Sequence, residues 1–189
     1  LENENFVKND NNRCFYCRDE LSVKLIETAK QFQLDVVVDG THTDDLGDYR
    51  PGIAALRKNG IKSPLLDVEL SKDEIRTICK KIGLTIYNRP SNSCLASRIP
   101  WGQRVTAERL ARIEMGEIII KQLTGFELIR VRDLDGVAKI EVESNNISAL
   151  YEKNYLEQIV NKLQMIGFTS VTVDPNGYKS GNLTIIYEK

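Results

Sequence analysis

A chain of 189 residues with 41% hydrophobic and 28% charged side chains has the composition of an ordinary globular protein, which argues against a disordered one. Its 26 basic and 27 acidic side chains give a net charge of −1, so no overall field favours a nucleic-acid backbone and nucleic acid is not an expected partner. No apolar run approaches the roughly 20 residues that span a bilayer, and four unevenly spaced cysteines do not form a secreted disulfide framework, so we expect a cytoplasmic chain without a membrane partner.

The first half of the chain alternates helical and strand patterns, which is typical of βα units around a parallel sheet. Apolar side chains at a 3.6-residue period predict helices, and Ser71 and Glu74 have the spacing of a capping box. Short apolar runs between polar loops predict buried strands. The expected helices are 20–32, 51–59 and 72–82, and the expected strands are 34–38 and 64–68.

The second half predicts a small α+β domain. Thr106 caps a helix that runs to Gly125, and two strands joined by the turn 133–136 follow it. The order of elements is ferredoxin-like in its first five members. The later expected elements are strands 127–131 and 137–142, a helix at 155–166, and strands 170–173 and 183–187. We therefore expect an α/β domain over 1–88, a loop over 89–104 and an α+β domain over 105–189.

The strand expected at 34–38 leads into a loop, 39–52, that holds four aspartates and three glycines. In open α/β sheets, ligands bind beyond the carboxyl ends of the strands, where such loops lie. Glycines let backbone amides approach phosphate, and carboxylates bind magnesium. A solvated, turn-rich connection is the alternative. The predicted nucleotide-binding residues are Gly40, Thr41, Asp44, Asp45, Asp48 and Arg50.

Cys94 lies in an irregular loop between two prolines. A thiol becomes a nucleophilic thiolate in a positive or hydrogen-bonding setting, which Arg98 and the hydroxyls of Ser93 and Ser97 could supply. The alternative is a small buried hydrophobic residue. Cys94 is therefore a candidate nucleophile.

Arg130 and Arg132 are two residues apart on an expected strand, so their side chains share one face and suit the clamping of a phosphate or carboxylate. Surface ion pairs with Asp133 or Asp135 are the alternative. The remaining cysteines give weaker signals. The CxxC pair at 14 and 17 lacks the second pair of ligands that zinc needs, and the cysteine at 79 is expected in a helix core.

Four segments together resemble one known family. They are the run RCFYC at 13–17, VDGT at 38–41 with DDLGDYRPG at 44–52, CLASRIPWG at 94–102, and the arginines that flank Val131. They resemble the LarE family of ATP-dependent sacrificial sulfur transferases, which belongs to the PP-loop superfamily. The resemblance implies a PP-loop parallel sheet, ATP and magnesium as cofactors, and a homo-oligomer.

The resemblance also implies a mechanism. Mg-ATP adenylates a carboxylate of a pyridinium dicarboxylate mononucleotide on the route to the nickel-pincer cofactor of lactate racemase. The thiolate of Cys94 attacks the acyl-adenylate and then loses its sulfur, which leaves dehydroalanine. Ser97, Arg98, Arg130 and Arg132 are the implied substrate- or phosphate-binding residues. The neighbours of Cys94 at 91–93 are not cysteines, which favours the sacrificial reaction over an iron-sulfur cluster.

One departure from the family pattern leaves alternatives open. Family members begin with a strand and an SGGxDS loop for the ATP pyrophosphate, and this sequence has no such motif. We expect that segment to be truncated here or supplied by another chain. The alternatives are another PP-loop ligase, a tRNA thiolase, or a non-catalytic remnant that binds nucleotide or a partner. The magnesium ligands are unidentified, and candidates for the elimination base are Glu114, Glu117 and Asp135.

Overall fold

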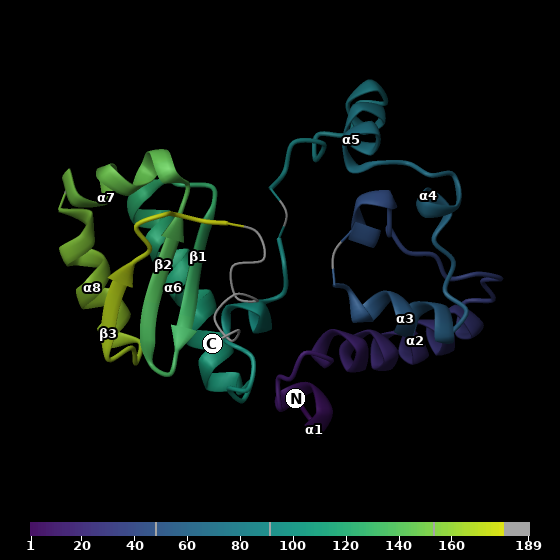
Figure 1. Ribbon diagram of the computed structural model, residues 1–189, viewed down its shortest axis with the longest axis horizontal. Coiled ribbons are helices and arrows are strands. Elements are labelled where there is room, and N and C mark those ends of the chain that lie inside the picture. The colour runs from purple at the N-terminus through teal and green to yellow at the C-terminus, as the bar shows by residue number, and fades with distance from the viewer. Residues whose placement is uncertain (48, 91, 153, 180–189) are drawn as a thin grey trace. The chain divides into compact units, whose positions relative to one another are not determined.

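The chain has an α/β architecture in which a small sheet accompanies many helices (Figure 1). The computed structural model describes residues 1–47, 49–90, 92–152 and 154–179. It divides into two compact units: a helical unit, Asn11–Ser91, and a sheet unit, Leu1–Asp10 with Asn92–Lys189. In the described residues, no helix combines the length and the apolar character needed to cross a membrane.

The helical unit is built on the packing of α2 (Arg13–Gln31) against α3 (Pro51–Lys58). Gly52 permits the close approach, because a Cβ there would lie 2.9 Å from Arg18 Cγ and 3.3 Å from the Cys14 carbonyl oxygen. Helix α2 begins seven residues earlier than its apolar period predicts. The first turns have no regular apolar period, and the contact with α3 stabilises them instead.

The capping box and the predicted third helix are confirmed. Helix α5 (Lys72–Lys81) begins after Ser71, whose hydroxyl accepts the Glu74 amide proton while the Glu74 carboxylate accepts the Ser71 amide proton. The positive φ of Gly83, +80°, lies just beyond the end of the helix. The 3-10 turn η1 (Thr43–Gly47) precedes α3.

Both strands expected in this half are wrong. Residues 34–38 make only a parallel bridge between Val38 and Lys62, and Leu34, Val36 and Val38 are 61%, 55% and 55% exposed. A single segment without paired neighbours does not make a stable sheet. Residues 64–67 instead form the helical turn α4 (Pro64–Asp67), because proline at the first helical position has the required φ and needs no hydrogen bond. The PP-loop sheet stays a prediction.

The sheet unit follows its predicted order. Helix α6 (Ala107–Thr124) begins at the Thr106 cap, which accepts the Arg109 amide proton, and ends at Gly125 with a φ of +74°. Strands β1 (Ile129–Leu134) and β2 (Val137–Val142) form an antiparallel hairpin. The two-residue turn has φ angles of +52° at Asp135 and +91° at Gly136, as a tight hairpin requires. Strand β1 begins two residues later than expected.

Strand β3 (Ser170–Val173) follows α8 (Tyr155–Met165) and pairs in parallel with β2, so the sheet order is β1-β2-β3. Helix α7 (Ile147–Glu152) was not predicted. The remaining short helical elements are α1 (Glu4–Val7), η2 (Leu95–Arg98) and η3 (Ser144–Asn146). The strand expected at 183–187 lies outside the described residues, and the ferredoxin-like arrangement stays a prediction.

One face of the sheet forms the hydrophobic core with α6 and α8. Gly116 lets α6 approach α8, because a Cβ there would lie 3.1 Å from Leu163 Cδ2; the Val131 methyl groups of β1 would be in ordinary contact at 3.5 Å. The other face carries polar cross-strand pairs, among them Arg130 with Glu141. The core side chains are Ile113, Ile120, Ile129, Val131, Ala138, Ile140, Val142, Ile159 and Leu163. The strand alternation thus places both arginines of β1 away from this core.

Candidate functional site: the Cys94 loop and its arginine cluster

The side chain of Cys94 is exposed at the start of the η2 turn. Its carbonyl oxygen accepts hydrogen bonds from the Ser97 amide at 2.9 Å and the Ser97 hydroxyl at 2.7 Å, which fixes the backbone and leaves the thiol open to solvent. Ala96 and Ile99 are among the buried residues of this loop. The alternative in which Cys94 is a small buried hydrophobic residue is therefore wrong.

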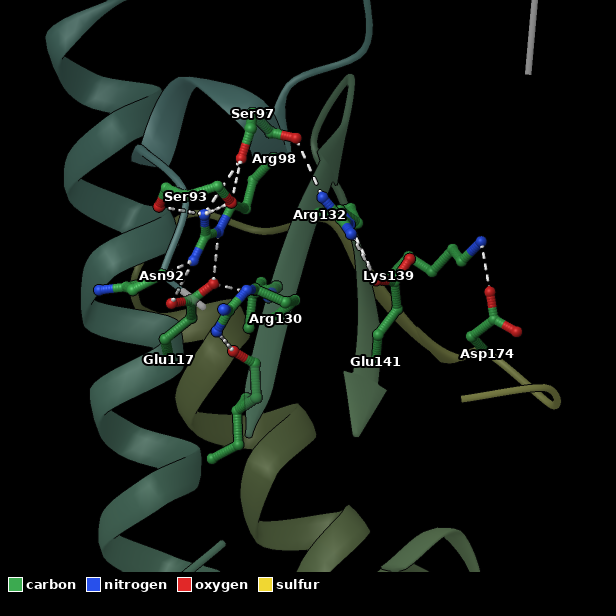
Figure 2. A network of polar contacts seen from close by, with 12 residues as sticks. Asn92, Ser93, Ser97, Arg98, Glu117, Arg130, Arg132, Lys139, Glu141 and Asp174 are labelled. Carbon is green, nitrogen blue, oxygen red and sulfur yellow. Dashed lines mark hydrogen bonds and ion pairs between the residues drawn. The ribbon is translucent and has the colours of Figure 1, made fainter. Parts of the chain in front are cut away.

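Arg98 is fully buried and holds the loop from inside. Its guanidinium donates to the Ser93 carbonyl oxygen at 2.7 Å and the Ser97 hydroxyl at 3.1 Å (Figure 2). It also donates to the Cys94 carbonyl oxygen at 3.0 Å. It also makes a two-pronged ion pair with Glu117, with Nε to Oε1 at 2.8 Å and Nη2 to Oε2 at 3.2 Å. Arg98 thus positions the backbone around Cys94, whose carbonyl oxygen it contacts directly.

Glu117 links this loop to the sheet. It lies on α6, and its Oε1 also accepts the Val131 amide proton at 3.2 Å. Among the described strands, β1 is at the edge of the sheet, and the Glu117 carboxylate provides a partner for one of its outward amides. Sequence reasoning considered Glu117 only as a possible base, because nothing local connects it to a residue 19 positions earlier. The structure assigns it to the support of the loop.

Arg132 holds the same turn from the strand side. It is buried, pairs with Glu141 Oε2 through Nη2 at 2.6 Å and Nε at 3.0 Å, and donates from Nη1 to the Ser97 carbonyl oxygen at 3.0 Å. The surface ion pair proposed as its alternative is wrong. Asp133 pairs instead with arginines of α6, Arg109 among them at 3.0 Å.

Arg130 completes a group of charged side chains, the arginine cluster, made of Arg98, Arg130, Arg132, Glu117 and Glu141, of which all but the half-buried Glu117 are buried. Its Nη1 donates to the Ile129 carbonyl oxygen at 2.7 Å, and its guanidinium lies 5.4 Å from the Tyr178 ring centre. Burial, and after it the positive charge of Arg98, lower the pKa of Arg130. Among the described residues, the cluster brings together three guanidinium groups and two carboxylates, and guanidinium groups suit the binding of an anion.

The carboxylates of the predicted nucleotide loop, in the helical unit, support their own surroundings. Asp45 is buried, pairs with Arg50 at 2.8 Å and accepts the His42 amide proton at 3.1 Å. Asp44 accepts the Lys72 amide proton at 2.8 Å and so caps α5. These contacts explain the conformation of the loop, and nucleotide binding by these residues stays a prediction.

The start of the same loop is tied to the segment after α3. The hydroxyls of Thr41 and Ser63 both donate to the Asp39 carboxylate, the second at 2.6 Å. Gly40 is open, because a Cβ there would meet nothing within 4 Å. Asp48 lies outside the described residues.

The described residues do not assemble a metal site by themselves. They contain no group of three or more histidine, cysteine, aspartate or glutamate side chains placed to hold an ion. Cys14 and Cys17 are both exposed on α2. Cys79 is half-buried on α5, so its expected place in a helix core is wrong. A magnesium ion bound with ATP would therefore need further ligands, such as the phosphate oxygens of ATP, in addition to carboxylates of the described residues.

The structure therefore brings together one group of predicted residues in the sheet unit. Cys94, Ser97, Arg98 and Arg132 are joined by direct hydrogen bonds, and Arg130 is close enough to feel the charge of Arg98. The predicted nucleotide loop belongs entirely to the helical unit.

Similar proteins are known although no protein-family model matches the sequence. The chain is 38% identical over 189 residues to uncharacterized protein slr1717 of Synechocystis sp., and the aligned region covers 100% of this chain and 70% of the relative. It is 33% identical over 178 residues to uncharacterized protein MJ0830 of Methanocaldococcus jannaschii, with coverages of 94% and 68%. It is 28% identical over 183 residues to the pyridinium-3,5-bisthiocarboxylic acid mononucleotide synthase of Lactiplantibacillus plantarum, with coverages of 97% and 65%.

Proposed function

This chain belongs to the protein family of slr1717 from Synechocystis and MJ0830 from Methanocaldococcus jannaschii. From the chemistry of its own residues, we propose that it is a sulfur transferase. Cys94 supplies the sulfur, and the product is the thiocarboxylate of a pyridinium dicarboxylate mononucleotide on the route to a nickel-pincer cofactor. The relative from Lactiplantibacillus plantarum is named as a synthase of such a product. The observation that carries the proposal is an exposed thiol on a backbone that the buried guanidinium groups of Arg98 and Arg132 hold in place.

The proposed reaction has two steps. First, the Cys94 thiolate attacks the carbonyl carbon of an acyl-adenylate, so a carbon–sulfur bond forms and the carbon–oxygen bond to AMP breaks. Second, a base removes the Cα proton of Cys94, the electron pair forms the Cα=Cβ double bond, and the Cβ–Sγ bond breaks. Sulfur leaves on the ligand as a thiocarboxylate, and dehydroalanine stays in the chain.

The residues around Cys94 suit both steps. Arg98 and Arg132 hold the carbonyl oxygens on either side of the turn, so the thiol is presented in a fixed place. The guanidinium groups of the arginine cluster would attract the phosphate or second carboxylate of the substrate. Of the three candidate bases, Glu117 is bonded to Arg98 and Val131, which leaves Glu114 and Asp135.

ATP is proposed as the co-substrate that activates the carboxylate, with magnesium as its counter-ion. The nucleotide-binding residues proposed are those of the loop at 40–50. The chain spans between 65% and 70% of the length of the relatives, so the activity of the longer proteins is extended to it only as a proposal.

The proposal is tested in two arms that separate activation from sulfur donation. In the first arm, the chain is incubated with Mg-ATP and the dicarboxylate mononucleotide; in the second, it receives a chemically prepared acyl-adenylate of a pyridine carboxylic acid. In the second arm the protein should lose the mass of one hydrogen sulfide molecule, and peptide mapping should place dehydroalanine at position 94. Reaction in the second arm alone would show that this chain donates sulfur but does not activate the carboxylate.

Two variants provide the controls. Cys94→Ser should abolish the mass loss, because a hydroxyl carries no sulfur to transfer. Cys14→Ser removes another exposed thiol and should leave the mass loss unchanged. Unchanged mass of the wild-type chain in the second arm, or thiocarboxylate formation by Cys94→Ser, would refute Cys94 as the sulfur source.

A further inference from the structure

The helical unit contains a pocket of about 230 Å³ beside α5. Four positions on one helical face, Lys72, Ile75, Arg76 and Cys79, line one side of it. Ile86, Tyr87 and Arg89, from the segment after α5, also line it, and Arg76 donates to the Arg89 carbonyl oxygen at 2.8 Å. Because that bond holds the segment against the helix, the pocket is a feature of the packed unit.

The lining of the pocket combines positive charge with an apolar wall. Lys72, Arg76 and Arg89 line it together with His42, and no carboxylate is among the described residues that line it. Asp44 and Asp45 approach the imidazole of His42 at 3.8 Å and 3.6 Å, and Asp44 also accepts the Lys72 amide proton. The apolar wall is formed by Leu65, Ile75, Ile86 and Tyr87. An anion with a small apolar body matches both surfaces.

We propose that this pocket binds a small organic anion in which a phosphate or carboxylate is attached to a single flat ring. The anionic group lies at Lys72, Arg76 and Arg89, and the ring lies against the apolar wall. A volume of about 230 Å³ is below the roughly 300–1,000 Å³ of drug-sized ligand sites, which limits the ligand to about one ring. The proposal does not rest on sulfur transfer, because every residue in it belongs to the helical unit.

Calorimetric titration with phenyl phosphate tests the proposal, with inorganic phosphate and phenol as the two separated halves of the ligand. Phenyl phosphate should bind at least tenfold more tightly than either half. Lys72→Gln and Arg89→Gln should each weaken it severalfold, whereas Lys81→Gln, an exposed lysine on the same helix that does not line the pocket, should not. Equal binding of phenol, or unchanged binding by both pocket variants, would overturn the assignment.

Cys79 offers an independent readout of location, because it lines the pocket and is half-buried. Phenyl phosphate should slow the alkylation of Cys79 by N-ethylmaleimide and leave the alkylation of the exposed Cys14 and Cys17 unchanged. Alkylation of Cys79 at the same rate with saturating ligand would place the bound anion elsewhere and refute the pocket.

Discussion

Glu117 should contribute far more to stability than an ordinary helix-surface glutamate. Its carboxylate is the charged partner of Arg98, which is fully buried, and it also accepts the outward amide of Val131. Replacing one partner of a buried ion pair leaves the other charge without compensation, which costs about 3–5 kcal/mol. The change Glu117→Gln keeps the shape of the side chain and removes only its charge.

The expected cost of Glu117→Gln is about 2–4 kcal/mol, for two reasons. The Glu117 side chain is 18% exposed, so water screens part of the interaction. The glutamine oxygen still accepts one hydrogen bond, but the new amide group places a donor against the donors of Arg98. The loss should therefore lie below the full cost of an uncompensated buried charge and well above the ~0.2–1 kcal/mol of an exposed pair.

Urea unfolding followed by the fluorescence of Trp101 measures this loss in the sheet unit, because Trp101 is the sole tryptophan and belongs to that unit. Glu114→Gln is the matched control. Glu114 is exposed three residues earlier on α6, so its replacement should change the free energy of unfolding by no more than about 0.5 kcal/mol. If Glu117→Gln costs less than about 1 kcal/mol, the link between α6, β1 and the Cys94 loop does not hold the loop as argued.

Three further predictions concern stability. Cys94→Ser should change the free energy of unfolding by less than about 0.5 kcal/mol, because the side chain is exposed; a larger loss in urea unfolding would mean that the thiol is packed. Asp133→Asn should destabilise the sheet unit at neutral pH but less so in acid: burial raises the pKa of Asp133, yet hydrogen bonds from Arg112, the Gly136 amide and Arg109 lower it below its ordinary value. Because the folded pKa is depressed, the stability that the Asp133 carboxylate contributes is complete above the unfolded pKa of about 3.9 and is lost as pH falls through the folded pKa. A difference in unfolding free energy between wild type and Asp133→Asn that stays constant from pH 7 to pH 3 would contradict this prediction. Gly177→Ala should destabilise the protein by about 1–3 kcal/mol, and by more than Gly125→Ala. Both glycines have positive φ, but only at Gly177 would a Cβ lie 2.6 Å from the Val142 carbonyl oxygen. Equal losses of thermal stability in the two variants would show that the backbone moves away from the added Cβ at no cost in free energy.

Elements with strong local signals were predictable from the sequence. Thr106 and Gly125 mark both ends of α6, and the capping box marks the start of α5, because these signals act within one helical turn. The strand predicted from the apolar run at 34–38 was wrong because strand formation depends on residues far away in the sequence. A short apolar segment becomes a strand only when other strands pair with it, and the described residues supply just one bridge.

Some residues of the candidate site were likewise predictable from the sequence, and others were not. The residue types of Cys94, Arg98 and Arg132 indicated a nucleophile among cations, and the strand period placed Arg130 and Arg132 on one face. The carboxylates that hold these arginines were not identified, since Glu117 is 19 residues from Arg98 and Glu141 is nine residues from Arg132. No local pattern connects Glu117 to Arg98, whereas the hairpin register places Glu141 opposite Arg130 and diagonal to Arg132.

The sequence by itself therefore determined the local elements of the sheet unit and the chemical types available near Cys94. Only the tertiary structure decided that the Cys94 thiol faces solvent while the Arg98 guanidinium is fully buried. The reason is that burial of a charge is tolerated only where an opposite charge meets it, and that meeting depends on how α6 packs against β1.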